Sequence, residues 1–305
     1  MTGEVLRLGT RASALATTQS RQVAALLEAA GVRCELVLIR TEGDVNRAPL
    51  ASIGGTGVFV TAVRDALLAG EVDVAVHSYK DLPTAAAPGI RLAAVPVRED
   101  PFDALCAGSG SSLAALPPGT TVGTGSPRRR AQLLALRPDL RIQPVRGNVD
   151  TRLALVTSGS LDAVVLARAG LSRLGRADHI TETFTADQLL PAPAQGALAI
   201  ECRDEDDWYL PAFEQLNDMA SRTAVSAERS LLATLEAGCS APVGALATVN
   251  GSGLALTGAV IAVDGSASVR GSVTGDAGDP IALGERLAFQ LLAQGAGTLL
   301  ALARS

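Results

Sequence analysis

The chain has 305 residues, of which 48% are apolar, 19% charged and 3% aromatic, and its formal net charge is −5. This length allows two or three domains, and the composition supports packed cores and argues against disorder. The negative charge gives no general case for nucleic-acid binding, and the few aromatic residues argue against stacking platforms for bases.

No apolar run approaches the roughly 18 residues that a membrane span needs, and Met1–Glu4 lacks the basic region of a signal peptide. The cysteines are scattered, with no C-x-x-C pair and no histidine nearby, at Cys34, Cys106, Cys202 and Cys239. We therefore expect no metal site, and a cytoplasmic protein with reduced thiols. The single lysine, Lys80, does not follow a glycine, which excludes a P-loop.

The first 200 residues alternate short apolar runs with helical periodicity. Strands are predicted over Glu4–Gly9, Cys34–Arg40 and Val72–His77, with helices over Ser13–Ala30 and Val58–Ala69 between them. This alternation predicts an α/β architecture with a mostly parallel sheet.

A loose internal repeat divides this region. Leu8–Ser13 and Val122–Arg128 each place a Gly-Thr turn with Arg and Ser before a helix, and Gly70–Val76 resembles Gly159–Val165. Chance similarity between βα units is one explanation; two similarly wound lobes that face each other are the other. Ligands bind where strands end and helices begin, and helix N-termini favour anions. The repeat therefore predicts two anion sites, one per lobe, that line one cleft.

The remaining segments predict connections and a further domain. Leu92–Phe102 and Gly196–Cys202 are interpreted as two crossovers that make a hinge. After Ser221 the pattern changes to a small α+β domain with an antiparallel sheet. Its expected elements are a helix over Thr223–Leu235, strands over Val243–Val249, Leu254–Val263 and Ser266–Val273, and a last helix over Pro280–Ala303.

Arginine supplies all but one of the 26 basic residues. A GC-rich genome explains the bias but not the positions. Arg128, Arg129 and Arg130 open a predicted helix, where positive charge opposes the helix dipole. Guanidinium groups bind carboxylates and phosphates bidentately, which favours an anion site. A solvated basic face is the alternative.

Polar residues at the end of the Val72–His77 strand are a second candidate site. Asp81 is a candidate acid, base or cation stabiliser there, and an Asx-turn aspartate before Pro83 is the alternative. His77 is interpreted as a strand-end hydrogen bonder rather than a metal ligand. Gly54–Gly57 is interpreted as a mobile loop rather than a phosphate loop.

Cys239 differs from the other cysteines because it lies in a loop beside Gly238. The other three fit apolar core patterns. A helix C-terminus does not itself favour a thiolate, so a reactive Cys239 needs cationic groups nearby.

Together these pieces resemble the porphobilinogen deaminase family. The matching stretches occur in family order over nearly the whole chain: Gly9–Ser13 with Gln19, His77–Pro83, Ser126–Arg129, Arg146–Leu153, Ala169–Leu174, Gln195–Ala197 and Glu236–Gly244.

The resemblance implies three domains. They are residues 1–96 with 197–218, residues 97–196, and residues 219–305, the first two similar to periplasmic-binding-protein lobes joined by two crossovers. It also implies a dipyrromethane cofactor on a thioether to Cys239. The implied enzyme is a transferase of haem and porphyrin biosynthesis that condenses four porphobilinogens head to tail, loses ammonia each time and releases the linear tetrapyrrole hydroxymethylbilane.

Residue roles follow from the same resemblance. Asp81 matches the family's catalytic aspartate. The implied cofactor contacts, besides Cys239, are Lys80, Ser126, Arg128, Arg129, Arg146 and Arg152. The implied substrate contacts are Arg11, Ser13, Gln19, Arg146, Arg152, Arg173 and Gln195. Because each ring carries an acetate and a propionate, a growing polyanion needs many fixed cations.

Two departures from the family pattern stand out. Thr56 and Thr61 occupy a loop where relatives often have lysines, and Pro127 replaces a commoner apolar residue and is expected to stiffen a helix start.

Two other classes of function remain open from the sequence. One is a non-enzymatic two-lobed protein that binds organic anions, and the other is an effector-sensing regulator, for which no helix-turn-helix precedes the lobes. The expected partners are porphobilinogen and the growing polypyrrole, without nucleic acid or membrane, and the expected state is a monomer.

Overall fold

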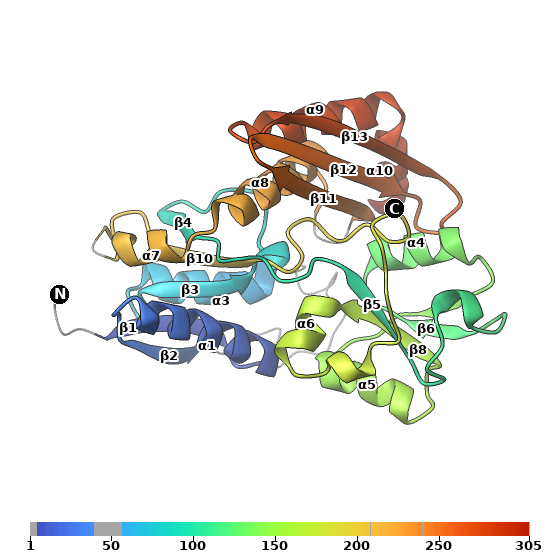
Figure 1. Cartoon of the computed structure of the whole chain (residues 1–305), viewed down its shortest axis with the longest axis horizontal. Helices are drawn as coiled ribbons and strands as arrows, with labels where there is room; N and C mark the ends of the chain where they lie inside the picture. Colours follow the sequence, from blue (N-terminus) through green and yellow to red (C-terminus); the bar gives the residue numbers. More distant parts are fainter. Residues whose placement is uncertain (1–4, 40–56, 208, 239–240, 305) are drawn as a thin grey trace. The chain divides into compact units, whose positions relative to one another are not determined.

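The computed structural model describes residues 5–39, 57–207, 209–238 and 241–304 (Figure 1). The chain divides into two compact units. Unit 1 comprises Met1–Glu99 and Ala197–Arg222, and unit 2 comprises Asp100–Gly196 and Thr223–Ser305. The three-domain boundaries given above stay a prediction.

Unit 1 is built on a five-stranded sheet in the order β2-β1-β3-β10-β4. β1 is parallel to β2 and β3, whereas β10 is antiparallel to β3 and β4. Its elements are β1 (Leu6–Arg11), α1 (Ala14–Ala29), β2 (Cys34–Ile39), α3 (Gly57–Leu68), β3 (Val74–Ser78), the short 3₁₀ helix η2 (Tyr79–Asp81), β4 (Ile90–Ala94), β10 (Leu198–Arg203) and α7 (Leu210–Leu216).

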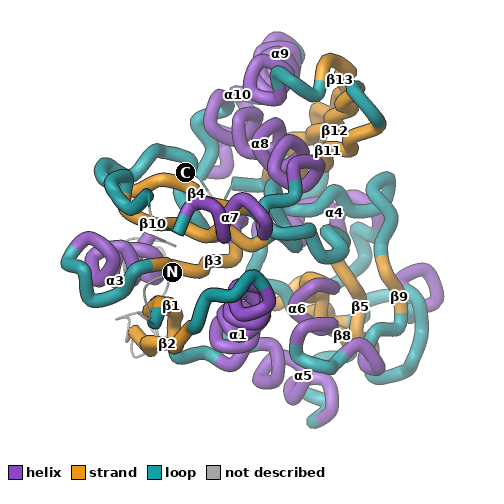
Figure 2. The backbone as a smooth tube through the Cα atoms, turned by 60° about the vertical axis from the view of Figure 1, so that its left-hand side comes forward, coloured by secondary structure: helices purple, strands orange, loops and turns teal. Residues whose placement is uncertain are grey.

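Helices cover both faces of this sheet (Figure 2). On one face, Leu8 and Val76 pack with Leu27 of α1 and Phe213 of α7. On the other face, Ala75 packs with Leu67 of α3. Successive residues of a strand point to opposite faces of the sheet. The apolar runs of β1 and β3 therefore place apolar side chains in the cores on both faces.

The first part of unit 2 repeats the same plan. Its sheet order is β7-β6-β8-β5-β9, with β6 parallel to β7 and β8, and β5 antiparallel to β8 and β9. Its elements are β5 (Asp103–Ala107), η3 (Leu113–Ala115), β6 (Thr121–Gly123), α4 (Pro127–Leu136), β7 (Arg141–Gln143), α5 (Val149–Thr157), β8 (Ala163–Ala167), α6 (Arg168–Arg173), η4 (Ala177–His179) and β9 (Glu182–Thr183).

The two sheets confirm the repeat that the sequence suggested. In each sheet the fourth strand, β10 or β5, is the one that the chain enters directly after passing from the other unit. That strand runs antiparallel to both neighbours, so the other four strands of each sheet all run in one direction. The expectation of a mostly parallel sheet is confirmed for strand direction, with one antiparallel strand in each sheet.

The second part of unit 2 is the expected α+β domain with a small antiparallel sheet. Its sheet order is β11-β12-β13, and Leu256 of β12 packs with Leu231 and Leu287. Its elements are α8 (Met219–Thr234, whose first residues belong to unit 1), β11 (Val243–Asn250), β12 (Gly253–Ile261), β13 (Ser268–Asp276), α9 (Pro280–Ala293) and α10 (Ala296–Arg304).

One long C-terminal helix was expected, and that expectation is wrong. The helix breaks after Ala293, where Gly295 has a φ of +97°, a conformation that glycine adopts without a Cβ clash. Among the described residues no single helix is long and apolar enough to cross a membrane; α9 and α10 reach that length and apolar composition only as a pair bent by 86°.

The α+β domain packs directly on α4. Gly265, in the β12–β13 turn, has a φ of +78°, and a Cβ there would lie 2.5 Å from the backbone nitrogen of Ala135. Beneath it, Ala131 of α4 shares a small core with Leu190 and Ile261. This close approach joins the two parts of unit 2 into one compact body.

Other expectations have mixed outcomes. Strand β7 ends at Gln143, directly before Pro144, because proline has no N–H to donate to a sheet. Cys106 and Cys202 are buried as expected, and Cys34 is half-buried. Cys239 and the segment Gly54–Thr56 lie outside the described residues. Thr61 was expected in the loop with Thr56, and that expectation is wrong, because Thr61 lies in helix α3.

Candidate active site

The polar residues of unit 1 gather where β1 and β3 end. These neighbouring strands are parallel, so their carboxyl ends meet at one edge of the sheet. Arg11 is the last residue of β1, and Ser78 is the last residue of β3. Lys80 and Asp81 follow at once in η2, both half-buried.

Helix α1 starts at the same edge. The Ser13 hydroxyl caps it by accepting from the backbone nitrogen of Ala16 at 3.3 Å. Buried Gln19 donates from Nε2 to Ser78 Oγ at 2.9 Å, which holds the helix against the end of β3. The structure therefore brings Arg11, Ser13, Gln19, Lys80 and Asp81 to one edge of unit 1.

His77 lies beside a buried ion pair next to this edge. Its Nε2 lies 3.4 Å from Glu201 Oε2, and Arg64 donates to the same carboxylate from Nε at 2.9 Å and Nη2 at 2.6 Å. Burial raises the pKa of Glu201, but the contacts with Arg64 and His77 outweigh it and hold the pKa at about 2. His77 is thus a strand-end polar residue, and no group of three metal-ligating side chains occurs within the described ranges.

The corresponding edge of unit 2 is formed by the start of α4. The Ser126 hydroxyl accepts from the backbone nitrogen of Arg129 at 3.4 Å, and Pro127 occupies the first helical turn, where its fixed φ fits and its missing N–H costs nothing. Gly125 passes so close to the next loop that a Cβ would lie 2.6 Å from the Val145 carbonyl oxygen.

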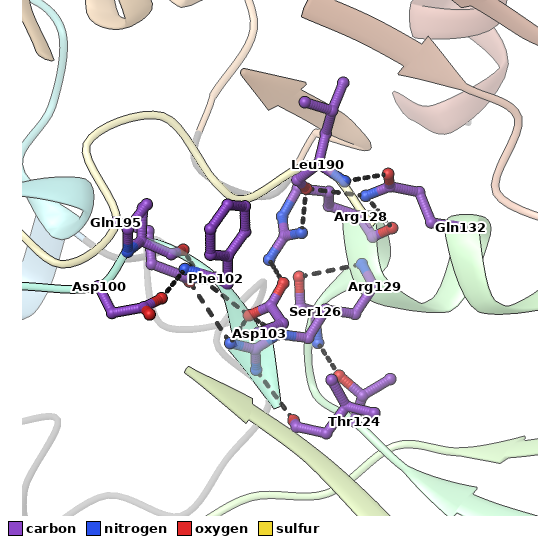
Figure 3. A network of polar contacts seen from close by, with 12 residues as sticks. Asp100, Phe102, Asp103, Thr124, Ser126, Arg128, Arg129, Gln132, Leu190 and Gln195 are labelled. Atoms are coloured by element: carbon purple, nitrogen blue, oxygen red, sulfur yellow. Dashed lines mark hydrogen bonds and ion pairs between the residues drawn. The ribbon is translucent and has the colours of Figure 1, made fainter. Parts of the chain in front are cut away.

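Arg128 and Arg129 share one buried carboxylate, Asp103 (Figure 3). Arg128 Nη2 lies 2.7 Å from Asp103 Oδ2, and Arg129 Nε donates to Oδ1 at 2.9 Å. Asp103 is fully buried, and Arg128 and Arg129 are 3% and 5% exposed. Burial raises the pKa of Asp103, but the two guanidinium groups reverse the shift and hold it at about 2.

Arg130 has a different partner from its two neighbours. It is exposed, and after the hydrogen bonds from Ser266 its charge also lowers the pKa of Asp264 in the β12–β13 turn. The first turn of α4 carries no acidic residue of its own, so Asp103 and Asp264 supply the negative charge that the helix start lacks. The reason for three successive arginines is therefore partly internal, which the sequence reasoning missed.

A net positive charge nevertheless remains at this edge. Arg152, at the start of α5, is half-buried and donates from Nε to the Gly147 carbonyl at 3.0 Å. Burial and the charges of Arg129 and Arg146 lower its pKa to about 10. Like charges are close enough to repel, and an anionic ligand would relieve that repulsion.

Arg173 and Gln195 complete the predicted set in unit 2. Arg173 donates from Nη2 to the Gly196 carbonyl at 2.8 Å. Gln195 stands between two residues of positive φ, Ala194 at 61° and Gly196 at 90°. Its amide is 1% exposed and donates from Nε2 to Asp103 Oδ1 at 2.8 Å, so it braces the arginines from within.

Asp103 and Glu201 are the two residues that sequence reasoning missed. Each is an acidic residue within an otherwise apolar strand run, Asp103–Ala107 and Leu198–Cys202. A lone charge in a buried strand needs a counter-charge, so this signal could have pointed to a buried arginine partner.

Two solved structures show a distant resemblance to this chain. One is a periplasmic substrate-binding protein of an ABC transporter from Coxiella burnetii, with 13% identity and a TM-score of 0.44 over 74% of this chain and 97% of that chain. Another is a nutrient-binding protein from Burkholderia cenocepacia bound to methionine, with 13% identity and a TM-score of 0.42 over 69% of this chain and 90% of that one. At these TM-scores the likeness carries no argument.

Sequence relatives are much nearer. The chain is 58% identical to a porphobilinogen deaminase from Thermobifida fusca over 97% of this chain and 95% of the relative. It is 56% identical to one from Nocardia farcinica over 98% and 89%, and 54% identical to one from Mycobacterium bovis over 97% and 98%. The model for the porphobilinogen deaminase dipyrromethane cofactor binding domain matches residues 6–210, and the model for the C-terminal domain matches residues 222–293. The chain therefore belongs to the porphobilinogen deaminase family.

Proposed function

We propose that this chain condenses four porphobilinogens head to tail with loss of ammonia and releases hydroxymethylbilane. Family membership over nearly the whole chain supports the reaction. Among the geometric observations, the pair Arg128 and Arg129 carries the most weight, because two buried guanidinium groups face the single carboxylate of Asp103 and leave a net positive charge at this sheet edge. Such an edge suits a ligand that gains two carboxylates with every ring.

The residues of unit 2 fit the dipyrromethane cofactor that the family model names. Two pyrrole rings with acetate and propionate side chains bring four carboxylates. Arg128, Arg129, Arg146 and Arg152 would hold them, and the buried Nε of Arg128 has no hydrogen-bond partner within the described part of the chain. Ser126 at the start of α4 and Lys80 in unit 1 are the further proposed contacts. When bound, the cofactor supplies the pyrrole carbon to which the first substrate ring is joined.

Asp81 is the proposed catalytic carboxylate. It follows a buried strand directly and is half-buried, so its charge is less screened by water than a surface carboxylate. Loss of ammonia from porphobilinogen leaves a cation, and joining two rings puts positive charge on a pyrrole. A fixed carboxylate near the pyrrole nitrogens would stabilise both and could accept the proton that leaves the joined carbon.

The proposed substrate contacts occur in each of the two units. In unit 1 these are Arg11, Ser13 and Gln19, and in unit 2 they are Arg146, Arg152, Arg173 and Gln195. Arginine at most of these positions suits carboxylate side chains, because its planar fork matches two carboxylate oxygens.

The rival interpretation, a protein that binds organic anions without chemistry, explains less. It gives no reason for the match of residues 222–293 to a deaminase C-terminal domain. We further propose a monomer in the cytoplasm; light scattering coupled to size exclusion would measure the mass of the particle in solution.

Cys239 is the proposed attachment point of the cofactor, and intact mass tests it. The wild-type protein should exceed its sequence mass by two pyrrole units and consume porphobilinogen. Cys239→Ser should have its sequence mass and negligible activity, whereas the control Cys34→Ser should keep both cofactor and turnover. Normal holo mass in Cys239→Ser would refute the assignment, and wild-type protein without added mass or turnover would refute the proposed function.

A further inference from the structure

Asp103 makes contacts that go beyond neutralising charge. Its Oδ1 accepts hydrogen bonds from Arg129 Nε at 2.9 Å and from Gln195 Nε2 at 2.8 Å. Its Oδ2 accepts one from Arg128 Nη2 at 2.7 Å. Arg129 Nη2 also lies 2.7 Å from Oδ1. Both oxygens of one fully buried carboxylate are thus engaged by three side chains that were predicted to bind ligand.

These contacts fix the direction of Arg129. The guanidinium is planar. Its Nε and Nη2 atoms contact Asp103, and its Nη1 donates to the Val165 carbonyl oxygen at 3.1 Å. Two partners on different edges prevent rotation about the last side-chain bonds. The N–H groups that these partners do not use therefore point in a set direction.

The group formed by Asp103, Arg128 and Arg129 keeps a positive charge that can attract an anion. Arg129 is close enough to Arg152 to lower the pKa of Arg152, so its charge acts on the cationic cluster although Asp103 holds it. One carboxylate faces two arginines, which leaves the trio of Asp103, Arg128 and Arg129 with a net positive charge. Asp103 therefore holds the arginines in place without cancelling their attraction for anions.

We propose that Asp103 is a positioning residue for the polypyrrole carboxylates, acting through Arg129 and Arg128. The inference rests on the proposed function. It has a consequence that separates it from simple electrostatics: removing a carboxylate adds positive charge to the site, which on charge alone should tighten the binding of a polyanion. Positioning requires the opposite, because arginines that turn freely lose the bidentate geometry.

The experiment compares full-length Asp103→Asn with wild type and with Glu201→Gln as the matched control. Glu201 is also a buried carboxylate, and it pairs with Arg64 in unit 1. Both substitutions should lower the thermal midpoint. Only Asp103→Asn should also lower the holo fraction in intact-mass spectra and raise KM for porphobilinogen roughly tenfold or more, the loss expected for a misaligned charge-assisted bond.

A KM equal to or below that of wild type in folded Asp103→Asn would overturn the inference, as would an equal rise in Glu201→Gln. Asp103→Glu serves where the Asn variant does not fold, because it keeps the charge and moves the oxygens by one methylene; its KM should also rise, and an unchanged KM counts against positioning.

A double-mutant cycle adds a second reading. Arg129→Lys keeps the charge but loses the fork, so Asp103→Asn should raise KM less in that background than in wild type, with the remaining effect passing through Arg128. Fully additive effects would contradict action through Arg129. Wild-type protein without cofactor mass would instead refute the proposed function itself.

Discussion

Gln19 and Ser78 bond to each other twice: Gln19 Nε2 donates to Ser78 Oγ at 2.9 Å, and the Ser78 hydroxyl lies 3.1 Å from Gln19 Oε1. The pair joins the buried side of α1 to the end of β3, three residues before Asp81. The segment that carries the candidate catalytic carboxylate, Asp81, is thereby held against helix α1, which starts at the same sheet edge.

Ser78→Ala should destabilise the protein by about 1–3 kcal/mol, because it leaves the buried amide of Gln19 without its partner. Ser20→Ala is the matched control. The Ser20 hydroxyl is buried on the same helix and has no hydrogen-bond partner among the described residues, so its loss should be neutral or slightly stabilising. Urea unfolding measures both, and equal effects would contradict the importance of the pair.

Asp81→Asn should abolish turnover while fold and cofactor remain, since a catalytic electrostatic contact of this kind is worth about 3–4 kcal/mol, or two to three orders of magnitude in rate. Asp81→Glu keeps the charge and should retain weak turnover. Porphobilinogen consumption is measured beside circular dichroism and intact mass. If folded, cofactor-bearing Asp81→Asn turned over within about tenfold of wild type, Asp81 would be only a turn residue.

Arg152→Leu should weaken binding without weakening the fold. Burial and the charges of Arg129 and Arg146 already disfavour its positive form, so removing it relieves repulsion in the folded state. The thermal midpoint should stay or rise, whereas affinity should fall roughly 10- to 150-fold for the lost charge-assisted bond.

Mass spectra of Arg152→Leu should show chains stalled at a defined number of added rings. The control Arg176→Leu removes an exposed arginine that pairs with Asp150 and should leave elongation intact. Uniform slowing without stalled chains would indicate a general electrostatic patch. Leucine at Arg128 or Arg129 should, in addition, destabilise the fold, because it leaves Asp103 buried with one partner fewer.

Acid should remove a defined part of the stability. The pKa of Glu201 in the folded protein is about 2, below its ordinary value of 4.5, so its contribution is complete above that ordinary value and disappears as pH falls toward 2. The shift corresponds to about 3 kcal/mol. The free energies of unfolding of wild type and Glu201→Gln, measured with urea, should therefore converge as pH falls from 5 to about 2. A difference between the two free energies that stays constant with pH would argue against the ion pair with Arg64.

The sequence alone determined the family, because motifs such as His77–Pro83 and Glu236–Gly244 stand in order along the chain. It also suggested the two repeated lobes, since the strand–Gly-Thr–helix turns at Gly9 and Gly123 are local features of backbone and cap, and the two sheets confirmed them. Apolar periodicity located most of the helices and strands to within a few residues, because burial of one face imposes that period. Motif order, helix caps and apolar periodicity all depend on residues close together in the chain, and a single sequence is enough to identify them.

Only the tertiary structure decided which charges meet. Asp103 lies 25 and 26 residues before Arg128 and Arg129, and Glu201 lies 137 residues after Arg64. Such pairs produce no periodic pattern in the sequence, because the order of strands in the sheet, and not the spacing of the residues along the chain, decides which charges meet. The antiparallel entry of β5 and β10 likewise follows from sheet pairing. That is why the arginines could be predicted as anion binders from the sequence, while the carboxylate that holds two of them could not.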